Sequence, residues 1–218
     1  MDYLAGDLLA FSGDGPISWG IKVGTCSPIS HIGGIAFITR EQLRTQRAID
    51  PTLISERMFN RWNGKHLLFE STTLADSPDL LTGRTIKGVQ SHLPDYRVGN
   101  YKGTVELFRL TDQYRERFDR EGSTERLSVA ALRMLGREYD GRGAIRSGSM
   151  LANRVRHFWA WRKSDRSSLF CSEYWASILQ AVDLLPISDS SKYTPGGLFR
   201  LLVRSAVYRP HSILKGAA

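Results

Sequence analysis

The sequence predicts an α+β domain, and two observations lead to this fold class. Before residue 110, short apolar and β-branched segments alternate with turn residues, which is typical of strands. After residue 110, apolar residues recur at the i, i+4, i+7 spacing of amphipathic helices. Because the strands precede the main helices, we expect a mostly antiparallel sheet of about five strands packed against helices.

Length and composition restrict the architecture further. With 218 residues, 41% of them hydrophobic, the chain can form a sizeable core, and we expect a single domain over residues 1–218. It contains no run of eighteen apolar residues that would span a bilayer. Asp2 stands where a secretion signal would carry Lys or Arg, so we expect no export signal and a cytoplasmic location, with delivery to the cell envelope requiring another route.

Five segments are predicted to be strands. They are apolar or alternate in polarity, and turn residues such as those of FSGDGP separate them. The segment HIGGIAFIT is too short and too interrupted by Gly for a stable helix, so we expect a buried strand there. The predicted strands cover residues 6–11, 31–39, 65–72, 85–92 and 104–110.

The helical predictions depend on periodicity and on end signals. Leu127, Ala131 and Leu135 share one face of a predicted long helix. Pro186 ends a strongly periodic segment, and Thr194 followed by Pro begins another. The predicted helices cover residues 17–24, closed by Gly24, about 40–47 within an otherwise irregular polar stretch, 112–137, 171–185 and 194–206.

Cys171 is the residue that most favours chemistry. It begins the predicted helix 171–185, so its thiol would lie beside unsatisfied backbone N–H groups at the positive end of the helix dipole. Both stabilise a thiolate, and the same N–H groups can hold a developing oxyanion. The alternative is that Cys171 is a small buried core residue. Cys26, the second cysteine, carries no comparable signal, and we expect two free thiols.

A thiolate nucleophile needs a base and an acceptor that orients it. Among five histidines, His31 is favoured because it opens a buried strand after a turn; the others are His66, His92, His157 and His211. Glu70 follows three apolar residues in the strand HLLFE, where a partly buried carboxylate needs a cationic partner. A structural histidine and a surface glutamate are the alternatives.

The net charge of +8 is concentrated in one segment. Residues 141–166 hold seven positive residues against one acid, whereas the rest of the chain is nearly balanced. Their aromatic residues favour a helix that contacts an anionic membrane or walls a cleft. Solvated arginines around a packed apolar face are the alternative. The candidate contact residues are Arg154, Arg156, Trp159, Arg162 and Lys163.

The order of several blocks resembles a known family. GDLLAF, GTCSPISHIGGIAF, HLLFEST, GREYD, LFCSEYWASIL and YTPGGL occur in this order between residues 6 and about 198. The set is similar to the circularly permuted papain-like hydrolases of the NlpC type, specifically the YiiX and YaeF-like group. The family pattern is often found on exported or lipid-anchored proteins, whereas this sequence shows neither a signal nor a lipobox cysteine.

The resemblance implies a papain-like core in which the histidine strand precedes the cysteine helix. It places the nucleophile at Cys171, the base at His31 and the polar third member at Glu70. Tyr139 matches a tyrosine block, and it and Ser172 are candidates for a cleft or oxyanion contact. The implied activity is thiolate acyl transfer on a peptide amide or an acyl ester, with no cofactor.

Other classes of function are less well supported. Cys26 and His31, with Cys171 or His66, fit no strong zinc spacing, so we expect no metal. No phosphate-binding glycine motif occurs. We do not expect nucleic acid as a partner; the expected partners are a peptide or acyl substrate and an anionic membrane surface. A non-catalytic basic module of the same fold, binding membrane or nucleic acid, remains the alternative function.

Overall fold

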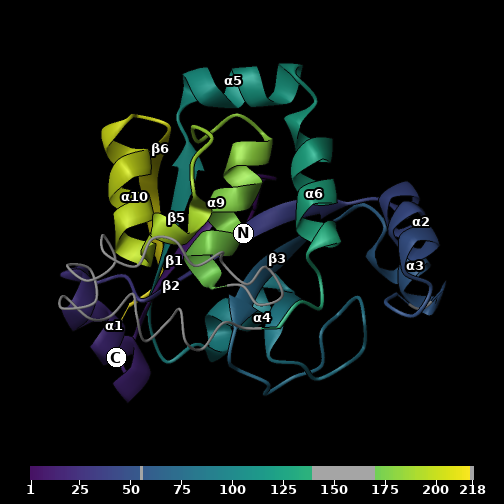
Figure 1. Cartoon of the computed structure of the whole chain (residues 1–218), viewed down its shortest axis with the longest axis horizontal. Coiled ribbons are helices and arrows are strands. Elements are labelled where there is room, and N and C mark those ends of the chain that lie inside the picture. The colour runs from purple at the N-terminus through teal and green to yellow at the C-terminus, as the bar shows by residue number, and fades with distance from the viewer. Residues whose placement is uncertain (55, 139–169, 217–218) are drawn as a thin grey trace.

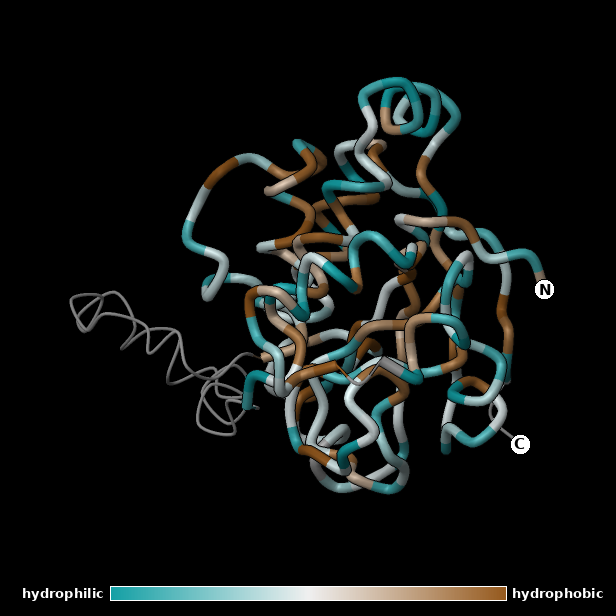
Figure 2. The backbone as a smooth tube through the Cα atoms, turned by 90° about the vertical axis from the view of Figure 1, so that its right-hand side faces the viewer, coloured by the Kyte–Doolittle hydropathy of each residue, from teal (hydrophilic) through white to brown (hydrophobic). Residues whose placement is uncertain are grey.

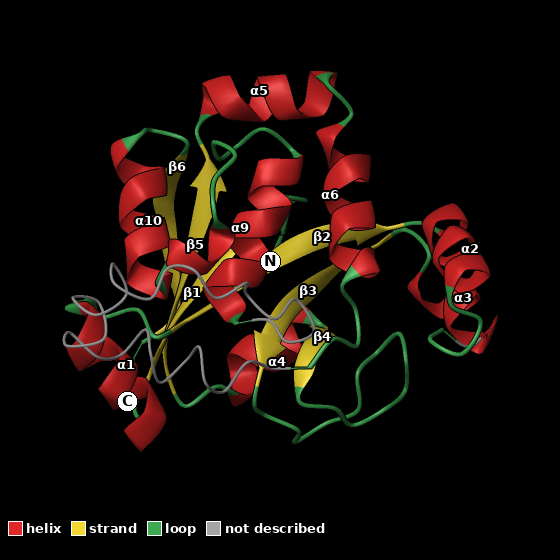
Figure 3. Ribbon diagram, in the orientation of Figure 1, coloured by secondary structure: helices red, strands yellow, loops and turns green. Residues whose placement is uncertain are grey.

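The computed structural model describes residues 1–54, 56–138 and 170–216, and it confirms the α+β class. Six strands form one sheet in the order β4-β3-β2-β1-β5-β6, and every neighbouring pair is antiparallel (Figure 3). The strands are β1 (Leu8–Gly13), β2 (His31–Ile38), β3 (Lys65–Thr72), β4 (Gly88–His92), β5 (Gly103–Leu110) and β6 (Tyr208–Lys215).

Helices occupy most of the connections. No helix in the described ranges is long and apolar enough to cross a membrane. The helices are α1 (Pro16–Thr25), α2 (Arg40–Ile49), α3 (Glu56–Trp62), α4 (Pro94–Asn100), α5 (Asp112–Arg120), α6 (Ser123–Arg133), α9 (Cys171–Ala181) and α10 (Pro195–Arg204), with a short 3-10 turn η1 (Ser190–Lys192).

The single helix predicted over residues 112–137 is wrong. The chain breaks it into α5 and α6 at Gly122, whose φ of 64° belongs to the left-handed region that a helix excludes. Other predicted ends also differ: α1 continues past Gly24 to Thr25, α9 ends at Ala181 instead of residue 185, and α10 ends at Arg204 instead of residue 206. Cys26 takes the left-handed position after α1, with a φ of 48°.

Several elements were not predicted because their sequences are polar. The stretch expected to be irregular contains α3 as well as α2, and α2 begins with a capping box between Thr39 and Gln42. The short helix α4 was also missed, as was β6, in which four residues are exposed, Pro210 among them. Pro210 is tolerated in β6 because this strand lies at the edge of the sheet.

The two faces of the sheet bury separate apolar clusters. Helices α6, α9 and α10 cover one face, where Leu8 and Phe69 join the larger cluster (Figure 1). Leu9 and Leu68, the alternate residues of the same strands, face a smaller cluster that includes Val98 of α4. Figure 2 shows that α5, at the top of that view, is mostly hydrophilic.

One close contact fixes α9 on the sheet. The Trp175 ring lies directly over Gly34 of β2, and its Nε1 donates a hydrogen bond to the Phe69 carbonyl of β3 at 3.0 Å. A side chain at position 34 would overlap the Trp175 ring and approach Leu8 Cδ2 to 2.8 Å. The absence of a side chain at Gly34 therefore sets how closely the helix that carries Cys171 approaches β2.

Gly34→Ala is expected to lower the free energy of unfolding by about 1–3 kcal/mol, because the added methyl overpacks the contact with Trp175. Urea unfolding followed by circular dichroism measures this loss. Gly20→Ala in α1 is the matched control, since nothing lies within 4 Å of its added methyl. The control is expected to stabilise the protein slightly. Equal effects of the two substitutions would contradict the packing argument.

Candidate active site

The first turn of α9 presents Cys171, as the sequence predicts. Phe170 is the N-cap residue with extended backbone angles, and its carbonyl accepts the N–H of Tyr174 at 2.9 Å. Cys171 is therefore the first helical residue, and its backbone N–H has no partner within the helix. A negative charge on its sulfur would lie at the positive end of the helix dipole.

His31 joins the thiol to a carboxylate on the next strand. It is the first residue of β2, and its Nε2 lies 2.6 Å from Oε2 of Glu70 on β3. The strand register explains this contact: Glu70 pairs with Gly33, so His31 lies two residues away on the same face. Cys171 is the other group that acts on the His31 ring, and it raises the pKa of His31. Since Glu70 occupies Nε2, the nitrogen left for the thiol is Nδ1.

Glu70 is fully buried and has two further basic neighbours. Nε of Arg97 donates to its Oε1 at 2.5 Å, and Nη2 of Arg97 donates to its Oε2 at 3.3 Å. Nε2 of His92 lies 3.4 Å from Oε1 without forming a hydrogen bond. One carboxylate thus faces groups from β2, β4 and α4. The sequence places only His31 in this set.

The pKa values of this cluster follow from its charges. Burial on its own would raise the pKa of Glu70, but Arg97, His31 and His92 outweigh burial and hold that pKa well below its ordinary value. Burial on its own would lower the pKa of His31, but Cys171 and Glu70 raise it to about 9. The arrangement therefore favours an imidazolium beside an ionised carboxylate near neutral pH.

The thiol lies beneath apolar side chains. Cys171 is 0% exposed and forms a small cluster with Ile21 of α1 and Phe170, whereas the His31 side chain is 13% exposed. Cys26, in contrast, is exposed, and neither cysteine forms a disulfide. A carbonyl compound can reach the Cys171 sulfur only after a covering side chain moves.

The other candidate residues have different surroundings. Ser172 is buried, and its hydroxyl donates to the Tyr193 carbonyl at 2.5 Å, which ties the first turn of α9 to the loop before α10. A role for Ser172 at an oxyanion stays a prediction. The remaining candidates lie outside the described residues: Tyr139, Arg154, Arg156, Trp159, Arg162 and Lys163.

Arg97 and His92 are the site neighbours that the sequence interpretation missed. Arg97 belongs to the short polar helix α4, and His92 ends β4 next to Leu93 and Pro94. Neither local sequence contains a functional motif. The one available signal was indirect: an acidic residue inside the apolar run of HLLFE requires a buried cation, but the sequence does not say which.

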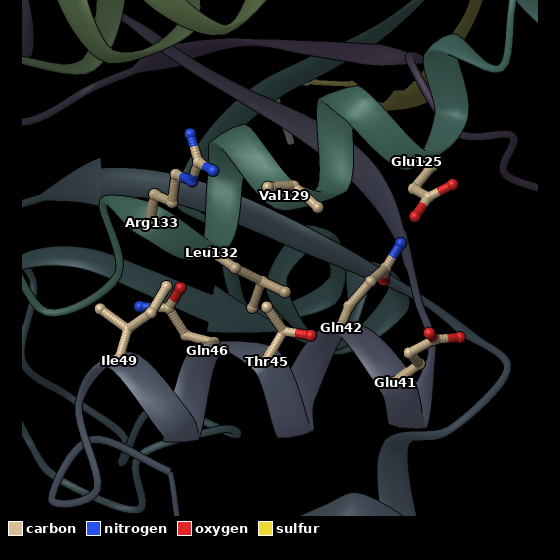
Figure 4. A pocket seen from close by; sticks show the side chains of 9 residues that line it. All are labelled: Glu41, Gln42, Thr45, Gln46, Ile49, Glu125, Val129, Leu132 and Arg133. Carbon is tan, nitrogen blue, oxygen red and sulfur yellow. The ribbon is translucent and has the colours of Figure 1, made fainter.

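The surface of the described residues has a hollow apart from the candidate active site. The hollow lies between α2 and α6 and is lined by side chains of those helices, such as Gln46 and Leu132 (Figure 4). Cys171, His31 and Glu70 do not line it. Within the same residues, no group of three His, Cys, Asp or Glu side chains could hold a metal ion.

Comparisons with known proteins yield a likeness of fold. No family model matches the chain, and no curated protein matches it. Among solved structures, the metalloprotein yiiX from Escherichia coli O157:H7 is similar, with a TM-score of 0.49 and 14% identity over 100% of this chain and 92% of that chain.

Glu70→Gln is expected to lower the pKa of His31 from about 9 toward its ordinary value of 6.5, because the amide cannot stabilise the imidazolium as a carboxylate does. An NMR titration of the ring nitrogens measures the change. His66 is the internal control: burial lowers its pKa, and its titration is expected to stay where it is in the wild type. An unchanged His31 titration would contradict the proposed coupling.

Ile21→Ala is expected to raise the rate of Cys171 alkylation by iodoacetamide several-fold, because Ile21 packs on this residue. The rate is measured in a Cys26→Ser background, which removes the exposed thiol. Val23→Ala is the matched control, since Val23 is on the same helix but 55% exposed. If both substitutions leave the rate unchanged, Ile21 does not limit access to the thiol.

Proposed function

We propose that the protein is a cysteine hydrolase that acts by thiolate acyl transfer. The observation that carries the proposal is the position of His31 between two groups: Nε2 of its ring lies 2.6 Å from the Glu70 carboxylate, and Cys171 acts on the same ring and raises its pKa. The three residues come from three different elements, α9, β2 and β3, so the tertiary fold brings them together. A nucleophile, a base and an acceptor that orients the base are the elements that such catalysis needs.

In the proposed mechanism, the Cys171 thiol proton moves to Nδ1 of His31, and the sulfur attacks a carbonyl carbon. The oxyanion of the tetrahedral intermediate accepts a hydrogen bond from the Cys171 backbone N–H at the start of α9. As the carbon–nitrogen or carbon–oxygen bond breaks, His31 returns the proton to the leaving amine or alcohol. A thioester on Cys171 remains.

Water completes the proposed reaction. His31 takes a proton from the attacking water, the thioester carbon–sulfur bond breaks, and the carboxylic acid leaves while the proton returns to the sulfur. Throughout these steps, Glu70 accepts the hydrogen bond from Nε2 of His31 and keeps the ring oriented. If an alcohol or amine replaced water, the same intermediate would give acyl transfer instead of hydrolysis.

We place this site in a circularly permuted papain-like fold of the NlpC type. The order along the chain supports this proposal, because the strand of His31 and the strand of Glu70 both precede the helix of Cys171. The proposed substrates are a cell-wall stem peptide or an acyl ester of a lipid. Both contain a carbonyl carbon, and the same mechanism through a tetrahedral intermediate acts on either. The alternative of a non-catalytic basic module depends on residues 141–166, none of which the structure describes.

Cys171→Ala is expected to reduce hydrolysis by about 10³-fold or more, because the nucleophile is removed. The assay compares short- and long-chain p-nitrophenyl esters with a cell-wall stem peptide, and circular dichroism checks the fold. Cys26→Ser is the matched control and is expected to keep the wild-type rate, since its side chain is exposed on the loop after α1. Hydrolysis that survives in Cys171→Ala would exclude the proposed nucleophile.

A further inference from the structure

Arg97 is a buried cation that contacts Glu70, the partner of His31. Its side chain is 6% exposed, and its guanidinium contacts both oxygens of the Glu70 carboxylate. The carbon at its centre also lies 5.7 Å from the centre of the Phe11 ring and 5.4 Å from that of Tyr101. A guanidinium in contact with two rings and a carboxylate has little freedom to reorient.

The geometry divides the Glu70 carboxylate between two partners. Oε1 accepts the shorter hydrogen bond from Arg97, while Oε2 faces Nε2 of His31 at 2.6 Å and also accepts Nη2 of Arg97 at 3.3 Å. A two-point contact of this kind fixes the plane of the carboxylate. The contact from Arg97 of α4 therefore sets the direction in which Oε2 of Glu70 faces His31.

The charges around Glu70 make this contact necessary. The groups that face the carboxylate are His31 of β2, His92 of β4 and Arg97 of α4. Asp76 and Tyr101 act on Arg97 from further away. Arg97 is the only permanent cation among the three, because arginine stays charged at every pH that a folded protein tolerates. A fully buried carboxylate without such a partner would take up a proton.

We propose that Arg97 is a positioning residue of the candidate active site: its two-point contact keeps the Glu70 carboxylate ionised and aimed at Nε2 of His31, and so holds Nδ1 of His31 toward Cys171. This inference rests on the proposed function. Arg97 touches neither the thiol nor a substrate in this proposal, and it acts through Glu70 alone. A purely structural arginine would instead tie α4 to β3 without affecting the titration or reactivity of the site.

Two substitutions separate the charge of Arg97 from its geometry. Arg97→Met keeps an unbranched side chain but removes the charge, whereas Arg97→Lys keeps the charge and loses the planar two-point contact. Arg109→Met is the matched control. Arg109 also pairs with a buried carboxylate, Asp7, at 3.4 Å, but that carboxylate belongs to a different cluster.

The experiment records the His31 ring nitrogens by NMR from pH 4 to 10 and the alkylation rate of Cys171 over the same range. Both are measured in a Cys26→Ser background. In Arg97→Met, an additional step is expected in the acid range of the His31 titration, because Glu70 then takes up a proton there. Alkylation and kcat are expected to fall about 10- to 100-fold, with a smaller change in KM, the range for one lost charge-assisted hydrogen bond.

The control variants decide between positioning and structure. Arg97→Lys is expected to lack the additional acid step but to react more slowly than the wild type, and Arg109→Met is expected to match the wild type in both measurements. A folded Arg97→Met with the wild-type His31 titration and alkylation profile would overturn the proposal. If Arg97→Met does not fold, a Lys variant with the wild-type rate would overturn it instead.

The two proposals fail in different ways. The effect of Arg97 on the His31 titration is measured without a substrate, so it remains observable if the protein hydrolyses no ester or peptide. If Arg97 substitutions leave the His31 titration unchanged while Cys171→Ala abolishes hydrolysis, the positioning role of Arg97 is rejected and the hydrolase proposal stands. If hydrolysis does not depend on Cys171 but the His31 titration depends on Arg97, the hydrolase proposal is rejected and the effect of Arg97 on the site stands.

Discussion

The burial of one carboxylate, Glu70, is the constraint on which the candidate site depends. An ionised carboxylate inside a protein costs several kcal/mol in lost hydration unless hydrogen bonds and opposite charges replace the water. Here Arg97 of α4 and His31 of β2 supply both. The ion pair with Arg97 therefore does more than connect α4 to the sheet, because it leaves a negative charge available to His31. Without that charge, a histidine that is 13% exposed would favour its neutral form.

The backbone brings these groups together through two independent contacts on opposite faces of the sheet. On one face, the register between β2 and β3 places Glu70 opposite Gly33 and thus within reach of His31. On the other face, Gly34 allows Trp175 to pack against β2, which fixes the helix that begins with Cys171. The two adjacent glycines in HIGGIAF belong to these two contacts: Gly33 pairs with Glu70, and Gly34 packs against Trp175. A shift of one residue in this register would exchange the faces and separate the histidine from the carboxylate.

The sequence identified the residues whose positions depend on local structure, and it missed those whose positions depend on register or on packing between distant elements. A helix start at Cys171 and a strand start at His31 are local features, readable from capping and periodicity. The partners Arg97 and His92 are brought to Glu70 by the docking of α4 and by the pairing of β3 with β4, which composition does not encode visibly. The sequence missed β6 for the same reason. Its Pro210 and exposed polar residues are not typical of a strand, and β6 forms an edge strand only by pairing with β5.

In the proposed mechanism, transfer of the thiol proton to His31 leaves an alternating row of charges: the Cys171 thiolate, the His31 imidazolium, the Glu70 carboxylate and the Arg97 guanidinium. Each charge then lies next to one or two of opposite sign, and the row as a whole is neutral. Ile21 and Phe170 exclude water from the end of the row at Cys171, where the effective dielectric is lower and each of these attractions is stronger. The same apolar cover that restricts access to the thiol therefore favours the charged pair over the neutral one, provided that the far end of the row keeps its cation. The apolar side chains that favour the charged pair thus also block access to Cys171. A substrate that displaces them has to exclude water from the thiolate in their place.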